Sequence, residues 1–252
     1  LKHVPVVEYN PFEAIKTNVL GSQNVIDACL HEKVETAICV GTDKAVSPLN
    51  TYGATKLLME KLFVTSSNHT DAQRHKTKFI AIRYGNVLGS SGSVVPTLVK
   101  QIESGKNITI TDPNMTRFNI TMNQALDFII RSLKKGKGGE VFIPKLQAYS
   151  LEVLKDAILE IVKKDVKTEI ISVRPGEKYH ESLISKEELR NTFEDDEDYV
   201  ILQEKLLQTR NKKFKKTILK NEYSSNNVKL LDKEEIKNIL RKDMAEIFEN
   251  KL

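Results

Sequence analysis

The fold is decided by the stretch Val40-Gly-Thr-Asp-Lys-Ala-Val-Ser-Pro-Leu-Asn-Thr-Tyr-Gly-Ala-Thr-Lys56. It follows a short apolar run, Thr36–Val40, which is typical of a buried strand. After a loop containing Pro and Asn, the stretch ends in a predicted helix that carries Tyr52 and Lys56. These two residues are four apart, so their side chains lie on one face of that helix. The pattern therefore predicts a strand, a loop and a helix that presents a phenol beside an amine.

Five residues of this stretch are candidate catalytic groups. A cation next to a phenol stabilises the phenolate and lowers the pKa of the phenol, so Tyr52 beside Lys56 is a plausible base near neutral pH. Thr42, at the end of the strand, is placed to hydrogen-bond the same substrate hydroxyl, and Asp43 and Lys44 add a second acid and base. Tyr-x-x-x-Lys alone is usually a surface pair and Asp-Lys alone is usually a solvated turn. The combination is more specific than either part.

This combination resembles the extended short-chain dehydrogenase/reductase superfamily. Within that superfamily it looks like the inverting UDP-N-acetylglucosamine 4,6-dehydratases, which start pseudaminic-acid and related surface-glycan pathways. The resemblance implies an α/β fold, namely the C-terminal part of a Rossmann-like doubly wound parallel sheet with a smaller α/β substrate-binding lobe. We expect residues 1–95 to be the remainder of the dinucleotide-binding domain, with the catalytic residues. Residues 96–252 would be mainly the substrate-binding lobe, interleaved with the final Rossmann elements and a C-terminal helix.

The phosphate-binding turn of such a domain is missing from the sequence. No Gly-x-x-Gly-x-x-Gly occurs, and the chain opens at Leu1-Lys2-His3-Val4-Pro5, which resembles the loop after the family's fourth strand. A dinucleotide fold uses its first strand–turn–helix to hold the pyrophosphate. We therefore expect a fragment that lacks on the order of 80 residues, at about 30 per strand–helix unit. In the family's arrangement, Lys2 would lie beside the cofactor or substrate.

A second informative stretch is Tyr84-Gly-Asn-Val-Leu-Gly-Ser-Ser-Gly-Ser-Val-Val-Pro96, after a predicted central strand at Phe79–Arg83. Ligands of doubly wound sheets bind at strand ends, and glycines let the backbone approach a ligand closely. Without a family match, a flexible loop is an equally good interpretation. The match to the family's Arg-Tyr-Gly-Asn-Val…Gly-Ser-Val-Val-Pro implies that Tyr84 and Val87 contact the nicotinamide, and that Asn86, Ser93 and Val94 contact the sugar diphosphate.

Two later segments also resemble the family. Thr111-Asp-Pro-Asn-Met-Thr-Arg-Phe118 matches a motif whose arginine, here Arg117, binds phosphate; its forked guanidinium suits a diphosphate, although spacing alone would favour a surface arginine. The segment Arg174-Pro-Gly-Glu-Lys-Tyr-His-Glu181 resembles one that closes over the nucleotide half of the substrate. It implies contacts from Arg174 to phosphate and from Glu177 to ribose hydroxyls. We expect His180 to be structural.

Periodicity supplies further expectations. A helix over Pro11–Leu30 contains Asn18, which by family resemblance helps to position the tyrosine region. A helix from Tyr52 to about Ser67 should turn an inner side toward the core. We also expect a strand at Glu169–Val173, a solvated acidic run at Glu194–Asp198, and a terminal helix from Lys233 to about Asn250. The residues expected on that inner side are Leu57, Leu58, Lys61 and Leu62.

Composition limits the class of protein. The 252 residues are 40% hydrophobic with a net charge of +5 and a pI near 8.9, enough for one large domain or a domain with a lobe. The basic run Arg210–Lys216 is better explained as a solvated face than as a nucleic-acid or membrane patch. Cys29 and Cys39 have no metal-type spacing, so we expect no metal site and reduced, cytoplasmic thiols. We find no signal peptide and no run long enough to span a membrane.

Three functions are consistent with these features. The favoured one is a UDP-N-acetylglucosamine 4,6-dehydratase with a tightly bound NAD or NADP that is recycled in each turnover, acting in polysaccharide biosynthesis. The alternatives are a UDP-sugar 4-epimerase on the same fold, and a non-catalytic nucleotide-sugar-binding fragment. The Asp43-Lys44 pair argues against the epimerase, which needs no acid and base for elimination. By resemblance we also expect a homo-oligomer.

Overall fold

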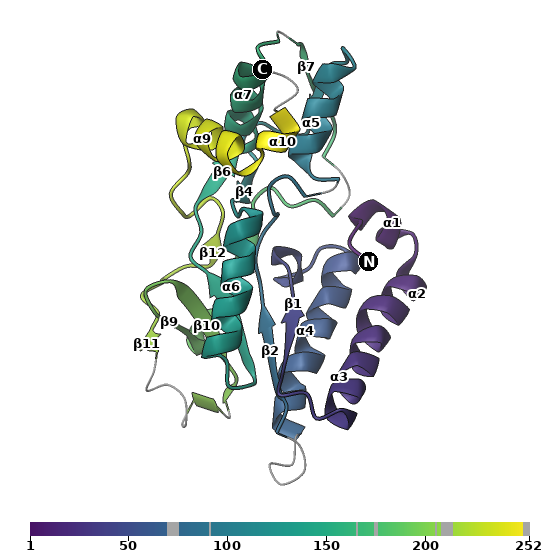
Figure 1. Cartoon of the computed structure of the whole chain (residues 1–252), viewed down its shortest axis with the longest axis vertical. Helices are drawn as coiled ribbons and strands as arrows, with labels where there is room; N and C mark the ends of the chain where they lie inside the picture. Colours follow the sequence, from purple (N-terminus) through teal and green to yellow (C-terminus); the bar gives the residue numbers. More distant parts are fainter. Residues whose placement is uncertain are drawn as a thin grey trace. The chain divides into compact units, whose positions relative to one another are not determined.

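The computed structural model describes residues 1–69, 76–90, 92–164, 166–173, 176–204, 206–207 and 214–248. The backbone is a mixed α/β fold that divides into two compact units (Figure 1). The first unit comprises Leu1–Tyr84, Asp127–Lys145 and Ser182–Tyr223, and the second comprises Gly85–Leu126, Leu146–Glu181 and Ser224–Leu252.

The first unit is built on a six-stranded sheet of order β1-β2-β5-β10-β9-β11. β1, β2 and β5 are parallel, while β10, β9 and β11 pair antiparallel. Ile38 of β1 is in register with Ile80 of β2. The strand bounds are β1 Thr36–Val40, β2 Lys78–Ile82, β5 Glu140–Pro144, β9 Thr192–Glu194, β10 Asp198–Leu202 and β11 Lys215–Lys216. Residues 79–82 of β2 are completely buried, as expected for a parallel strand covered on both faces, so the predicted parallel α/β sheet is confirmed.

Helices and turns of the first unit surround this sheet. Its helical elements are α1 Val4–Glu8, α2 Pro11–Ala14, the π-helix η1 Ile15–Leu20, α3 Gly21–His31, the 3₁₀ turn η2 Asp43–Ala45, α4 Thr51–His69 and the 3₁₀ turn η3 Glu187–Asn191. The short strand β8 spans Ser182–Ile184, and α6, Met122–Lys135, enters this unit at Asp127. The predicted helix over Pro11–Leu30 is therefore present, with a π turn in its middle that contains Asn18.

The inner face of α4 differs from the prediction. Leu58 is 51% exposed, Lys61 is also exposed, and Leu57 and Leu62 are only half-buried. The buried residues are Tyr52, Thr55, Met59, Glu60, Phe63 and Val64. The prediction followed the apolar residues alone, whereas the real face includes a buried carboxylate, Glu60, whose partner lies on another element.

The second unit packs short strands against helices. Its elements are α5 Val94–Glu103, β3 Ile108–Ile110, β4 Thr116–Phe118, β6 Ala148–Ser150, α7 Leu151–Val162, β7 Thr168–Ile170, α9 Lys233–Asp243 and α10 Ala245–Phe248. β3 pairs parallel with β7, and β4 antiparallel with β6. The core includes Leu98, Leu154 and Ile158. A capping box of Asp232 and Glu235 starts α9.

The expected bounds of one strand and of the terminal helix differ from those in the structure. The strand expected at Glu169–Val173 is β7, which ends at Ile170. The expected terminal helix ends at Asp243, after which Met244 separates it from α10, and residues 249–252 lie outside the described part of the chain. The last strand, β12 at Tyr223–Ser224, falls where the chain passes from one unit to the other.

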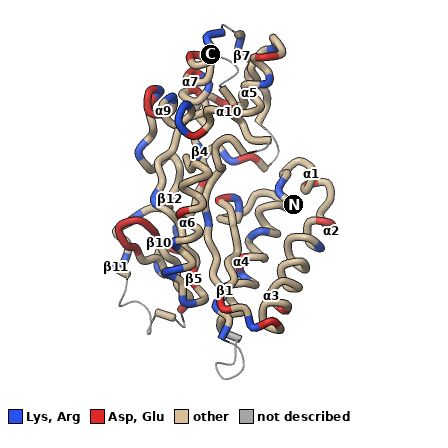
Figure 2. Tube along the Cα trace, viewed as in Figure 1, with Lys and Arg blue, Asp and Glu red and all other residues tan. Residues whose placement is uncertain are grey.

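Charges of both signs are interspersed along both units (Figure 2). Of the basic run, residues 210–213 lie outside the described part, Phe214 is buried, and Lys215–Lys216 form β11. Among the described residues no helix is long and apolar enough to cross a bilayer, and no cluster of His, Cys, Asp and Glu is arranged to hold a metal ion.

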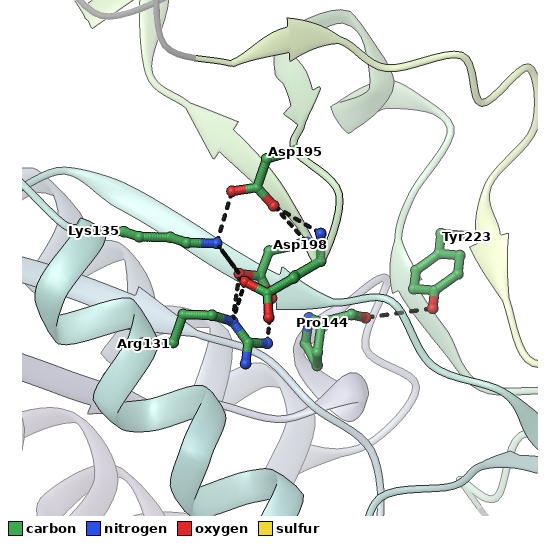
Figure 3. A network of polar contacts seen from close by, with 7 residues as sticks. Arg131, Lys135, Pro144, Asp195, Asp198 and Tyr223 are labelled. Atoms are coloured by element: carbon green, nitrogen blue, oxygen red, sulfur yellow. Dashed lines mark hydrogen bonds and ion pairs between the residues drawn. The ribbon is translucent and has the colours of Figure 1, made fainter.

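The acidic run Glu194–Asp198 is solvated only in part, since Asp196 and Glu197 are exposed while Asp198 is not. Asp198 is completely buried and accepts a bidentate pair from Arg131 of α6, with Nη2–Oδ1 and Nε–Oδ2 distances of 2.7 and 2.9 Å. Lys135, one turn later, donates to Asp198 Oδ2 at 2.8 Å and to Asp195 Oδ2 at 2.7 Å (Figure 3). The turn before β10 is thus tied to α6 by charge-assisted hydrogen bonds.

We expect the substitution Asp198→Asn to lower the free energy of unfolding by about 2 kcal/mol, because Arg131 and Lys135 lose a buried anionic acceptor. Urea denaturation at neutral pH measures this, and Asp196→Asn is the matched control, since Asp196 is exposed in the same turn. Equal stability of the two variants would show that the buried carboxylate contributes nothing beyond its shape.

Candidate active site

The chain turns sharply where β1 ends. Gly41 N–H donates to Ile82 O of β2 at 2.8 Å, and a Cβ at Gly41 would stand only 2.5 Å from that oxygen. A glycine is therefore required for this close approach. The turn carries residues 42–44 past the carboxyl end of β2, where Asp43 N–H donates to Tyr84 O at 3.2 Å. This strand end is where ligands bind in sheets of this type.

Thr42, Asp43 and Lys44 form one hydrogen-bonded group. Thr42 Oγ1 donates to Asp43 Oδ1 at 2.8 Å, and Lys44 Nζ forms an ion pair with the same oxygen at 3.1 Å. Asp43 is 1% exposed, and its second oxygen, Oδ2, has no hydrogen-bond partner among the described residues. A buried carboxylate oxygen without a partner is rare in proteins and often has a chemical role.

The start of α4 brings Tyr52 to this group. Asn50 caps the helix, with Gly53 N–H donating to its Oδ1 at 2.8 Å. A Cβ at Gly53 would stand 2.2 Å from Lys44 O and 3.0 Å from Pro48 Cβ. Only glycine at this position lets the first turn of α4 pack directly on η2, so the residue after Tyr52 controls the approach of the phenol to Thr42–Lys44.

We expect Gly53→Ala to lower kcat by about tenfold or more, since displacements near 1 Å at a catalytic group have costs of that order. The added methyl must push α4 away from Lys44 O, taking Tyr52 with it. Steady-state kinetics on folded protein measures the effect. Gly21→Ala is the matched control: Gly21 begins α3, and its Cβ would meet only Lys16 O at an ordinary 3.5 Å. Unchanged kcat in Gly53→Ala would contradict the packing argument.

Electrostatics around Tyr52 involve a different lysine from the one expected. Burial raises the pKa of the Tyr52 phenol above its ordinary value. This outweighs the lowering by a hydrogen bond with Thr42 and by the charge of Lys44, so the lowered pKa that the sequence led us to expect is not found. Lys56 Nζ instead donates to Val40 O at 3.0 Å and to Met59 Sδ at 3.3 Å, and burial lowers its pKa. The cation that favours the phenolate here is Lys44.

Asn18 reaches the same helix from the π turn. Its Nδ2 donates to Thr55 Oγ1 at 3.1 Å, and Thr55 Oγ1 donates to the carbonyl of Tyr52 at 2.9 Å. Asn18 is 6% exposed. π turns often occur at functional sites, and this one places a buried amide behind the tyrosine backbone.

Two of the expected cofactor residues also lie in the first unit. Tyr84 follows β2 and is half-buried, with its ring edge-to-face against Phe128 at a centroid distance of 6.3 Å. Burial raises the pKa of Tyr84. Lys2 is exposed, just before α1. The structure thus groups Thr42–Lys44 with Tyr52 and places Lys2 at the surface.

The remaining expected contacts lie in the second unit. Val87 forms a parallel bridge with Ile120, and half-buried Asn86 precedes it. Ser93 is the N-cap residue of α5, which starts at Val94. Ser93 Oγ is buried and makes no hydrogen bond within the described part of the chain, so the N-terminal end of α5 keeps a free hydroxyl beside its positive dipole.

Arg117 has neighbours that sequence reasoning did not expect. It is 6% exposed, its Nη1 donates to Thr116 O and Tyr179 O, and its Nη2 pairs with Glu177 Oε1 at 3.1 Å. The two residues assigned to phosphate and ribose therefore bind each other. Arg174 lies outside the described residues. His180 hydrogen-bonds Thr116 Oγ1 at 2.8 Å.

Sequence reasoning missed three further charged residues beside the site. Arg83 ends the β2 segment and is 1% exposed, Glu60 of α4 is completely buried, and Glu188 lies in η3. The signal in the sequence was the spacing of Tyr52, Lys56 and Glu60, which repeats every four residues and puts all three on one face of the helix.

Comparison with known proteins identifies the family of this chain. The model of the family described as "Polysaccharide biosynthesis protein" matches residues 1–204. A UDP-N-acetylglucosamine 4,6-dehydratase (inverting) of Campylobacter jejuni is 46% identical over 202 residues, which is 80% of this chain and 59% of that protein. A UDP-glucose 4-epimerase of Rickettsia akari is 39% identical, covering 95% of this chain and 71% of the relative.

A solved structure shows the same fold. The crystal structure of Pen from Bacillus thuringiensis matches with a TM-score of 0.85 and 38% identity, over 95% of this chain and 72% of that one. The chain thus spans between 59% and 72% of the length of these three relatives. On this evidence the chain belongs to the polysaccharide biosynthesis protein family, within the extended short-chain dehydrogenase/reductase superfamily.

Proposed function

We propose that this protein is a nucleotide-sugar 4,6-dehydratase that converts UDP-N-acetylglucosamine to a UDP-4-keto-6-deoxy-N-acetylhexosamine, inverted at C5, for surface-glycan synthesis. One observation carries the proposal: Asp43 and Lys44, an acid and a base joined at 3.1 Å, lie in the turn on which the Tyr52 helix packs. Elimination of water requires such a second pair in addition to the tyrosine.

The chemistry explains why two pairs are needed. The C5 proton of a hexose is hardly acidic, so direct loss of the 6-hydroxyl is very slow. Oxidation of C4 to a ketone places the C5 proton next to a carbonyl and makes its removal feasible. One set of groups must therefore act at the 4-hydroxyl, and another at C5 and C6.

Each side chain then has one role. Tyr52, hydrogen-bonded to Thr42, takes the proton of the 4-hydroxyl as C4 loses hydride. Within the Lys44–Asp43 pair, the ammonium first passes its proton to the carboxylate. The neutral Lys44 amine then removes the C5 proton, and the resulting carboxylic acid of Asp43, whose Oδ2 has no partner among the described residues, protonates the leaving 6-hydroxyl, which departs as water. Once C6 has been reduced, C5 takes a proton from water on the opposite face, which gives inversion, and the proton held by Tyr52 returns to solvent.

The first unit suits the nicotinamide end of a dinucleotide. Lys56 Nζ contacts a carbonyl and a thioether, both neutral, which leaves its charge for ribose hydroxyls. Tyr84 offers a half-buried ring at the end of β2, and Lys2 and Val87 remain further candidates. When bound, NAD or NADP supplies the hydride acceptor and returns the hydride within the same turnover.

For the UDP-sugar we retain the second-unit residues as binding candidates. The buried Ser93 Oγ and the adjacent start of α5 suit an anion. Arg117 is held in place by Glu177 and two carbonyls, so its orientation is already set before a diphosphate arrives. Asn86, Val94, Glu177 and Arg174 complete the set proposed from the family resemblance.

The rival function is a UDP-sugar 4-epimerase, which the 39% identity to the Rickettsia protein of that name favours. It would use Tyr52 but leave Asp43 and Lys44 without a role. The test is mass spectrometry of UDP-N-acetylglucosamine incubated with the full natural gene product, with Tyr52→Phe as the inactive control. A product lighter by one water supports dehydration. A product of unchanged mass but altered C4 configuration would replace the proposal with epimerisation, and no turnover with no sugar-nucleotide binding would reject both.

A further inference from the structure

Arg83 is the most completely bonded charge in the described part of the first unit. Its Nε and Nη2 donate to the two oxygens of Glu60 at 2.6 and 2.7 Å. Its Nη1 and Nη2 donate to the two oxygens of Glu188 at 2.9 and 2.7 Å, and Nη1 also donates to Leu183 O at 3.2 Å. All five N–H donors of a guanidinium are thereby used. We call Glu60, Arg83 and Glu188 the arginine clamp.

The clamp joins the elements that carry the acid–base site. Arg83 directly precedes Tyr84 at the end of β2. Glu60 lies on α4, one turn beyond Lys56 and two turns beyond Tyr52. Leu183 belongs to β8, which packs against η2, the turn of Asp43 and Lys44. A single side chain therefore bonds to α4 and to the strand that supports η2.

Stability alone does not explain this arrangement. The Glu60 carboxylate and the Arg83 guanidinium are buried together beside the half-buried Glu188, and apolar residues of similar volume often stabilise a core as well or better. What the clamp adds is geometry, because each bidentate contact fixes a distance and an orientation. A lysine at this position would supply the positive charge but not the planar set of N–H donors that binds a carboxylate through two hydrogen bonds.

We infer that Arg83 is a positioning device for catalysis: through Glu60 it fixes α4 so that Tyr52 faces Thr42–Lys44. This inference rests on the proposed function, in which Tyr52 is the base. It makes Arg83 and Glu60 positioning residues, since neither is assigned a contact with substrate, whereas Glu188 only completes the hydrogen bonding of Arg83. It also separates the two carboxylates, because only Glu60 lies on the helix that carries Tyr52.

The matched variants Glu60→Gln and Glu188→Gln test this. Each variant replaces one of the two carboxylates that accept hydrogen bonds from Arg83, so each substitution should lower the melting temperature. At a temperature where circular dichroism shows both to be folded, we expect Glu60→Gln to lower kcat by about 10- to 100-fold, as misplaced catalytic groups do. KM for the sugar nucleotide should change little, and Glu188→Gln should keep kcat near that of the parent.

The outcomes separate the inference from the proposed function. Tyr52→Phe is assayed alongside. Suppose that Tyr52→Phe is inactive. If Glu60→Gln then keeps full kcat, or if Glu60→Gln and Glu188→Gln lose kcat equally, the positioning role is overturned and the proposed function stands. If Tyr52→Phe keeps full activity, the proposed function fails first. A selective loss of kcat in Glu60→Gln, with inactive Tyr52→Phe, supports both.

Discussion

Asp43→Asn is expected to lower kcat for dehydration by about 10²- to 10⁴-fold, the usual contribution of a general acid, while sugar-nucleotide binding is retained. The amide keeps the size of the side chain, so Lys44 and Thr42 stay in place, but it has no proton to give to the leaving 6-hydroxyl. Oxidation at C4 depends on Tyr52, so Asp43→Asn should still carry out this step. Rapid-mixing absorbance of reduced nicotinamide and mass spectrometry of the product measure the two stages separately.

The matched control for this prediction is Asp27→Asn on α3. Its carboxylate is exposed and accepts a hydrogen bond from Gln23 at 2.8 Å, so both stages should run at the parent rate. A normal rate of water loss in Asp43→Asn would remove Asp43 from the mechanism. Loss of both stages together would show that Asp43 supports Tyr52 instead of acting on the 6-hydroxyl.

Arg83→Met is expected to lower the free energy of unfolding by about 3–5 kcal/mol at neutral pH, because it leaves the completely buried Glu60 and the half-buried Glu188 without the guanidinium. Guanidinium denaturation monitored by circular dichroism measures it. The control is Lys16→Met, which removes one end of an exposed pair with Glu13 and should change stability little. If Arg83→Met loses no more stability than Lys16→Met, then water or rearranged side chains take over the hydrogen bonds of the guanidinium.

The pH dependence of the same variant has a definite sign. In the parent protein Arg83 holds the pKa of Glu188 below its usual value against the opposing effect of burial. The stabilisation that Glu188 contributes through this pair is fully present above the pKa of the carboxyl in the unfolded chain. It is lost as the pH falls through the lowered pKa that the carboxyl has in the folded protein. In Arg83→Met the guanidinium no longer lowers the pKa of Glu188, so burial raises it, opposed only by the Ser185 backbone and the charge of Lys61. The stability gap between parent and variant should therefore narrow as the solution is acidified from pH 7, and a gap that widens would contradict this account.

Local signals predicted the site residues that lie close together in the chain. The apolar run of β1, the Asn50 cap and the spacing of Tyr52 and Lys56 describe interactions over a few residues, and the strand, turn and helix were found where they were expected. The same signals named Lys56 as the cation that acts on Tyr52, and this was wrong, because Lys44 acts on it. Which lysine acts on Tyr52 depends on how closely α4 packs on η2, which Gly53 permits.

Pairings between distant residues were not predicted. Asp198 was expected in solvent, yet it binds Arg131, 67 residues away. Arg117 and Glu177, 60 residues apart, were assigned to different parts of a ligand and bind each other. The inner side of α4 was misjudged because periodicity counts apolar residues and does not register a carboxylate that is buried with its partner.

The parallel α/β class was implied by the family resemblance of the motifs. The residues by themselves predicted the order of strand, turn and helix around Tyr52 and the grouping of Thr42, Asp43 and Lys44. These depend on short-range backbone preferences and on the alternation of apolar and polar residues, which a linear chain contains in full. Only the tertiary structure decided which charges are partners, since Arg83 reaches Glu60 and Glu188 across 23 and 105 residues. A buried charge is tolerated only where the folded chain places an opposite charge next to it, and that placement depends on the tertiary packing.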